Sequence, residues 1–232
     1  KYIDPYAFDG CNNLHKIDFS DESELLSLGK CSFANTQLSS ITIPPKFNDF
    51  KRGWCQETFH LTDVNISPKN HLFSRYDEDL VVGKSDPKLS FFDSLVFSSR
   101  SVISVFVPSF IKYINPYAFE ECEYMDRVHF GKHSKLISIG KCAFFSTGLT
   151  KINIPRHVKE IGKSAFYDCS NLKKIKFSSH SELESIGKTA FNDCSIGRIS
   201  IPKSVSSIGV LAFSFCARLR TVEILSESFI CN

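Results

Sequence analysis

Residues 161–177 read IGKSAFYDCSNLKKIKF, and residues 208–224 read IGVLAFSFCARLRTVEI. The two stretches share the pattern I-x-x-x-A-F-x-x-C-x-x-L-x-x-I-x-[IF], and they begin 47 residues apart. The Ala-Phe dipeptide, once Ser-Phe, recurs at Phe8, Phe33, Phe119, Phe144, Phe166, Phe191 and Phe213. The steps after Phe119 are 25, 22, 25 and 22 residues, so two kinds of coil alternate within a unit of 47.

Each repeat predicts a short strand and a tight turn. The alternation in L-x-x-I-x-I is typical of a half-buried strand with Leu and Ile inward. In the shorter coil a proline, as at Pro155, follows the strand and ends it, because proline cannot donate to a ladder. We expect the Ile-Gly pair to turn the chain through a backbone conformation that only glycine adopts easily. The K-x-A-F-x-x-C segment is too short for a stable helix and predicts a 3₁₀ or irregular turn.

One coil cannot bury its phenylalanine alone, but stacked coils bury a continuous core. A period of 22 to 25 residues with such a strand falls in the range of leucine-rich repeats. The sequence therefore predicts a mainly β repeat solenoid of the leucine-rich-repeat type. It would be curved, with a parallel concave sheet and short 3₁₀ or irregular convex segments.

The repeat weakens between Phe33 and Phe119. We expect a degenerate coil at 46–67 and a hairpin or loop insertion at 68–100, with residues 77–79 turning between two short strands. On this interpretation residues 1–232 form a single solenoid. The alternative is that 68–100 is a linker between two half-solenoids.

The stretches IGKSAFYDCSNLKKIKF and VKEIGKSAF (158–166) resemble the BspA-type leucine-rich repeats of bacterial and protist surface proteins. Residues 71–122 also resemble an insertion found in the members from flagellated parasitic protists. The resemblance implies a solenoid without a cofactor, on the cell surface or secreted. It also implies adhesion to host cells, matrix proteins or other microbes.

Composition excludes several other classes of protein. The formal net charge is only +3, so charge balance does not mark a nucleic-acid binder, and no nucleic acid is expected as a partner. No uncharged stretch approaches the roughly 20 residues of a membrane helix, so we expect no membrane segment. The chain opens without an initiating Met or an apolar signal region, and we expect a piece of a longer protein.

The cysteines follow the repeat rather than a pairing scheme. Most stand three residues after or two residues before a repeat phenylalanine, which predicts buried thiols that meet backbone carbonyls: Cys11, Cys122, Cys169, Cys194, Cys216, Cys31 and Cys142. The pairing of Cys55 and Cys231 is left open. His133 and His180 share one loop position and are interpreted as surface residues. No metal-binding or catalytic motif is found, so we expect no metal, no cofactor and no enzyme activity.

One column of outward positions is unusually basic. The residue before the first inward Ile or Val of each strand reads Lys16, Ser40 and Asp63, and then Arg127, Lys151, Lys174, Arg198 and Thr221. We name the following set the basic strip: Arg127, His129, Lys151, Lys173, Lys174, Lys176, Arg198 and Arg220. Its seven lysines and arginines stand against two acids on the same strands, Asp126 and Glu223, in a chain whose total is +3.

Like charges on neighbouring strands destabilise a sheet, and nothing in the fold requires them. The functional interpretation is a concave strip that binds an anionic ligand: a sulfated or sialylated glycan, an acidic protein segment or a phosphate polymer. The alternative is a solvated lysine-rich face that only prevents association. We expect a non-catalytic recognition or adhesion module with a protein or glycan partner at a cell surface. An intracellular protein-interaction scaffold is the competing hypothesis.

Overall fold

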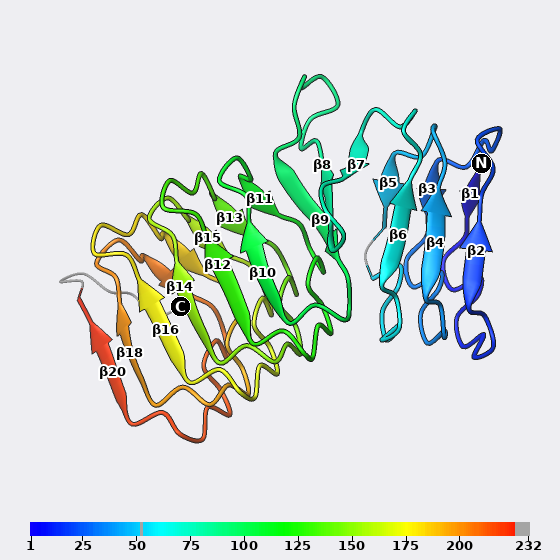
Figure 1. Ribbon diagram of the computed structural model, residues 1–232. Coiled ribbons are helices and arrows are strands. Elements are labelled where there is room, and N and C mark those ends of the chain that lie inside the picture. The colour runs from blue at the N-terminus through cyan, green and yellow to red at the C-terminus, as the bar shows by residue number, and fades with distance from the viewer. Residues whose placement is uncertain (52, 226–232) are drawn as a thin grey trace. The chain divides into compact units, whose positions relative to one another are not determined.

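The computed structural model describes residues 1–51 and 53–225. It divides the chain into two compact units, Lys1–Ser101 (unit 1) and Val102–Asn232 (unit 2). Each unit stacks short parallel strands coil upon coil (Figure 1), and the described residues contain no helix. The predicted leucine-rich-repeat solenoid class is therefore confirmed. A single solenoid over 1–232 stays a prediction, and Cys231 lies outside the described residues.

Unit 2 has two sets of parallel strands on opposite sides of its coils (Figure 1). The longer set is β10 (Ser104–Val107), β12 (Arg127–Phe130), β14 (Lys151–Ile154), β16 (Lys174–Phe177), β18 (Arg198–Ile201) and β20 (Thr221–Ile224). The shorter set is β11 (Tyr113–Ile114), β13 (Ser138–Ile139), β15 (Glu160–Ile161), β17 (Ser185–Ile186) and β19 (Ser207–Ile208). In the longer set the ladders join β10 to β12, β14 to β16 and β18 to β20.

The predicted inward and outward alternation is confirmed. In β14 Ile152 and Ile154 are buried, whereas Lys151 and Asn153 are exposed. The branched apolar side chains of successive coils thus line the core, and the residues between them face solvent.

The repeat phenylalanines form a stack of parallel rings through unit 2. Phe166 lies between Phe144 and Phe191, with ring centroids 5.0 and 5.1 Å apart and interplanar angles of 3° and 6°. All three rings have no exposed surface. Each ring therefore buries both faces only because a coil lies on either side.

The segment that holds each phenylalanine is a run of turns, because its backbone donors alternate in direction. The Phe119 N–H donates to Ala143 O in the next coil at 2.8 Å, whereas the Glu120 N–H donates to Tyr117 O in its own turn at 3.2 Å. Left-handed backbone at Tyr117 and Glu121, with φ of 67° and 60°, interrupts any helical continuation. Of the two predicted forms, the irregular turn is the one found.

The predicted role of the Ile-Gly glycines is wrong. Gly187 and Gly209 lie outside the left-handed region, which is occupied instead by non-glycine residues such as Thr189, with φ of 53°. A Cβ on Gly209 would lie 2.4 Å from the Lys188 backbone nitrogen, and one on Gly187 would lie 2.5 Å from that of Lys163. The glycine is needed because the backbones of neighbouring coils approach too closely for a side chain.

The inward cysteine slot is confirmed for three coils of unit 2. Each thiol donates to the carbonyl of a repeat phenylalanine: Cys169 to Phe144 at 3.0 Å, Cys194 to Phe166 at 3.2 Å and Cys216 to Phe191 at 3.1 Å. The neighbouring Cys169 thiol and burial raise the pKa of Cys194, which keeps it protonated as a donor. Cys11 departs from the prediction: it belongs to the first coil and is exposed.

Unit 1 repeats the same plan with an addition. Its parallel strands are β1 (Tyr2–Ile3), β3 (Ser27–Leu28) and β5 (Asp49–Phe50), and β2 (Lys16–Asp18), β4 (Ser40–Ile43) and β6 (Asp63–Ile66). An antiparallel set follows: β7 (Phe73–Arg75), β8 (Leu80–Gly83) and β9 (Ser94–Ser98). The turn predicted at 77–79 lies between β7 and β8, whereas β9 has no counterpart among the predicted strands.

Candidate ligand-binding face

The centre of the basic strip is a pair of facing lysines. In the β14–β16 ladder Lys151 lies opposite Lys174, and Asn153 lies opposite Lys176. The residues between them, Ile152 and Ile175, are buried and hold both strands against the core. The fold thus presents the two ammonium groups side by side on the solvent face.

The other members of the strip extend the row along unit 2. Arg127 and Arg198 are the first residues of β12 and β18, in the same position as Lys151 in β14, and His129 is the third residue of β12. Lys173 and Arg220 lie directly before β16 and β20, outside the ladders. All eight side chains are exposed.

Little negative charge balances the strip. Arg127 pairs with Asp126, with Nε and Oδ2 3.4 Å apart, and Glu223 accepts a hydrogen bond from Ser200 at 2.7 Å. Among the described residues, the structure shows no ion pair for Lys151, Lys174 or Lys176. Their ammonium groups therefore face solvent without a paired carboxylate.

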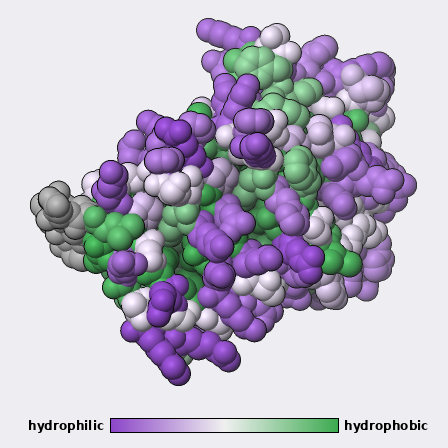
Figure 2. Space-filling model, turned by 60° about the vertical axis from the view of Figure 1, so that its left-hand side comes forward, coloured by the Kyte–Doolittle hydropathy of each residue, from purple (hydrophilic) through white to green (hydrophobic). Residues whose placement is uncertain are grey.

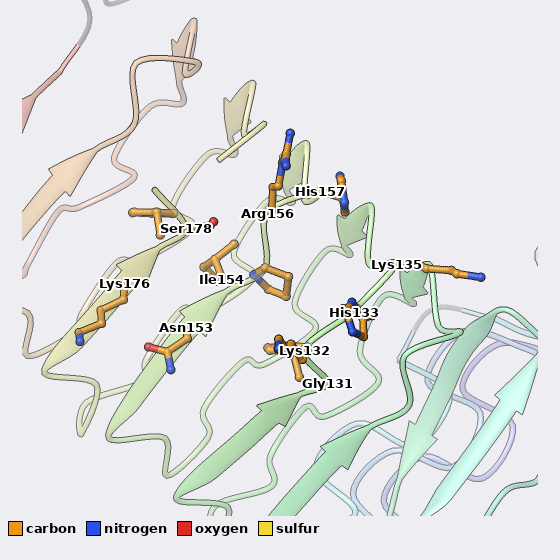
Figure 3. A pocket seen from close by; sticks show the side chains of 14 residues that line it. Gly131, Lys132, His133, Lys135, Asn153, Ile154, Arg156, His157, Lys176 and Ser178 are labelled. Carbon is orange, nitrogen blue, oxygen red and sulfur yellow. The ribbon is translucent and has the colours of Figure 1, made fainter. Parts of the chain in front are cut away.

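Two hollows flank these strands, where neighbouring strands are adjacent but belong to separate ladders. The one between β16 and β18, about 1200 Å³, is lined by Lys173, Lys174, Lys176 and Arg198 of the strip. The other, about 770 Å³, lies at the ends of β12, β14 and β16 and includes Lys176 (Figure 3). Figure 2 shows hydrophilic side chains over much of the face in view, with hydrophobic ones between them.

The second hollow adds residues that the sequence analysis missed. Arg156 and His157, in the turn after β14, line it together with Lys135 from the connection after β12 (Figure 3). Glu182 contacts both Arg156, at 3.2 Å, and His157, at 3.1 Å. His157 is the main cause that holds the pKa of Glu182 below its usual range. The signal for His157 was present, since it follows Ile154 by three residues as His133 follows Phe130.

The arrangement is suited to binding a repeating anion. Paired parallel strands lie about 4.8 Å apart, so Lys151 and Lys174 are closely spaced charge partners, and the neighbouring ladders add Arg127 and Arg198 on either side. Lysine ammonium groups bind as mobile point charges, and the arginines at either end add planar forks suited to carboxylate or sulfate.

No other type of site stands out in the part of the chain that the structure describes. It contains no group of three or more His, Cys, Asp or Glu side chains placed to bind a metal ion. It also contains no helix with the length and apolar character needed to cross a bilayer.

Three solved structures of similar fold come from bacteria. A leucine-rich repeat protein from Eubacterium ventriosum is 18% identical, with a TM-score of 0.80 over 95% of this chain and 57% of that one. A leucine-rich cell surface protein from Faecalibacterium prausnitzii is 23% identical, with a TM-score of 0.78 over 97% and 63%. The pneumococcal vaccine antigen PcpA is 23% identical, with a TM-score of 0.77 over 98% and 55%. The chain thus spans less than two thirds of each of these structures.

None of the curated protein sequences compared with the chain matches it. The BspA type leucine rich repeat region matches residues 1–76 and 90–228, in six copies. The interruption falls within the antiparallel insertion of unit 1. Because the match covers most of both units, the chain belongs to the BspA-type leucine-rich-repeat family.

Proposed function

We propose that this chain is a non-catalytic recognition module whose basic strip binds an anionic ligand at a cell surface. The observation that carries the proposal is the pairing of Lys151 with Lys174 in register, extended by Arg127 and Arg198 on the adjacent strands. A ligand with spaced negative groups relieves the repulsion that this row creates. Anionic glycans and acidic protein segments of a host or its matrix both have such groups.

The surface location is supported by relatives. Two proteins of similar fold carry the descriptions cell surface protein and vaccine antigen, which suit exposure outside the cell. A second candidate, an intracellular scaffold for an acidic protein partner, is favoured by buried thiols such as those of Cys169, Cys194 and Cys216, which donate to backbone carbonyls. Both candidates use the same strip.

Binding to an immobilised sulfated glycan tests the proposal. Reversing Lys151→Glu and Lys174→Glu together should weaken binding about tenfold or more, because both changes fall within the row. The matched control is Lys163→Glu with Lys188→Glu, two exposed lysines that follow the short strands β15 and β17. It changes net charge equally in neighbouring coils, and it should leave most of the binding.

Thermal melts must show that both double variants fold, as their exposed positions predict. Equal weakening by both pairs would mean that binding follows net charge rather than a located site. If neither pair weakened binding, the strip would be only a solvated face.

A further inference from the structure

The same turn closes the longer strands of unit 2. After β12 the Ser134 N–H donates to Gly131 O at 2.9 Å, and after β14 and β16 equivalent bonds of 3.3 and 3.0 Å join the first and fourth turn residues. The third residue of each of these three turns is a histidine. We name this set the histidine column: His133, His157 and His180.

Stacking of the coils brings these turns together. The β14–β16 ladder holds the turns after these two strands in register about 4.8 Å apart, and β12 with its turn is the neighbour of β14. A backbone bond of 2.9 Å from the Glu182 N–H to Arg156 O joins the second turn to the third coil. All three histidines are exposed and can exchange protons with solvent.

The histidine column shares both hollows with the basic strip. His133 and His157 line the hollow of about 770 Å³ beside Lys176, and Figure 3 shows them on neighbouring turns at the ends of the strands. His180 lines the hollow of about 1200 Å³ beside Lys174 and Arg198. A ligand seated on the strip and extending into either hollow therefore meets a histidine.

The charged groups around the column are almost all cationic. Those lining the two hollows are Lys132, Lys135, Arg156, Lys173, Lys174, Lys176, Arg198 and Lys203. The acid in contact with the column is Glu182, which holds His157 and Arg156 together. Because the pKa of Glu182 lies below its usual range, this carboxylate stays charged when the solution is made mildly acidic. Imidazole is the side chain that generally changes charge between pH 5 and 8, and any proton gained here adds to an already positive site.

We infer that the strip and the histidine column together form a proton-sensitive site for a sulfated polysaccharide, which binds more tightly as pH falls from neutral to mildly acidic. This inference rests on the proposed function of the strip and names its regulation. Two hollows of this size accommodate sugar rings, and sulfate esters stay ionised throughout the range. The change in affinity therefore arises from the protein.

The test measures binding of a sulfated polysaccharide at pH 7.5 and 5.5 at constant ionic strength. Affinity should rise about two- to fivefold for each histidine that meets the ligand, and therefore about tenfold or more where all three do. The variant His133→Gln/His157→Gln/His180→Gln should lose this gain. The matched control is His15→Gln/His60→Gln/His71→Gln, which removes three exposed histidines from unit 1 and should keep it. A separate His129→Gln variant measures the contribution of the histidine inside the strip.

The outcomes separate this inference from the proposed function. Binding that needs Lys151 and Lys174 but is equal at both pH values would overturn only the proton-sensitive site. The same conclusion would follow if both triple variants lost the gain equally. Binding that ignores Lys151 and Lys174 at both pH values would overturn the strip itself. Tighter binding of polyglutamate than of the sulfated polymer at both pH values would overturn the assigned ligand class.

Discussion

In unit 1 the charges on the outward face of the longer strands pair with one another, whereas in unit 2 like charges face each other. Lys16 pairs with Asp18 two residues along β2, at 2.8 Å. Arg75 of the insertion reaches back to β6, where its Nη1 lies 2.6 Å from Asp63 and 2.9 Å from Asn65 Oδ1. The charged side chains on this face of unit 1 are thus neutralised by partners within the chain.

Unit 2 has the same sheet but a different outward composition. Lys151 faces Lys174, and the structure shows no carboxylate in contact with either among the described residues. Beneath the two faces the cores are alike, since Phe33 of unit 1 and Phe166 of unit 2 are both fully buried and stacked on a repeat neighbour. The comparison teaches that the core specifies the fold, while the outward positions are left to vary with function.

The largest expected effect tests the common core. Phe166→Ala should lower the free energy of unfolding by about 3–5 kcal/mol, because it leaves a cavity between two stacked rings. Phe33→Ala should cost a similar amount in unit 1. Denaturant unfolding followed by far-UV circular dichroism measures both. A loss under about 1 kcal/mol at either site would contradict the equivalence of the two cores.

A smaller effect is expected at the polar slot of the core. Cys169→Ala should cost about 0.5–1.5 kcal/mol, since the Phe144 carbonyl loses one of two donors and keeps the Thr147 hydroxyl at 3.2 Å. Unit 1 fills the corresponding role with Thr58, whose hydroxyl donates to Phe33 O at 2.9 Å. Cys169→Thr should therefore destabilise less than Cys169→Ala in the same unfolding experiment. The reverse order would show that the slots of the two units are not equivalent.

Removing the acids of unit 1 should make its face resemble that of unit 2. Asp18→Asn with Asp63→Asn releases Lys16 and Arg75 from their ion pairs. In the Lys151→Glu/Lys174→Glu background this change should restore part of the salt-sensitive binding to a sulfated glycan. The melting temperature should shift by only about 2–4 °C, because exposed ion pairs stabilise little. No recovery of binding would mean that the strip depends on more than unpaired cations.

The smallest effect is a difference in acid sensitivity. In unit 1 hydrogen bonds from Lys16, Lys69 and Lys46 lower the pKa of Asp18, Asp21 and Glu24, and in unit 2 His157 lowers that of Glu182. A carboxyl with a lowered folded-state pKa stabilises the fold above its unfolded value, and this contribution is lost as pH falls through the folded value. Asp79, whose pKa burial raises, acts in the opposite direction.

Unit 1 should therefore lose slightly more protection than unit 2 as the protein is acidified from about pH 5 to below the unfolded carboxyl values near 4. Hydrogen exchange resolved by peptide measures the two units separately. Greater loss in unit 2 would contradict this assignment of the ion pairs.

The sequence was most informative where the repeat is regular. The alternation around Ile152 and Ile175 predicted which residues are buried, and it placed Lys151 beside Lys174 before the register was known. It misjudged the Ile-Gly glycines, because close approach between coils leaves no local sequence signal. It missed β9, whose run SLVFS has buried residues on both faces and therefore lacks the alternation of a half-buried strand. His157 was overlooked because the steps of 22 and 25 residues hide its equivalence to His133 and His180.

The alternating coils have a consequence for how such a face can grow. Arg127 and Lys174 are 47 residues apart, as are Lys151 and Arg198, and as are His133 and His180. A tandem duplication of one 47-residue segment therefore copies two cationic rungs and a histidine along with the core that supports them. The number of binding positions for a polymer therefore increases by the same amount with each added segment, while the core stays unchanged. Each added segment also lengthens the stretch of ligand that is bound at once. A lineage carrying this repeat could adjust avidity by changing the number of segments, while the contact chemistry of each rung stays the same.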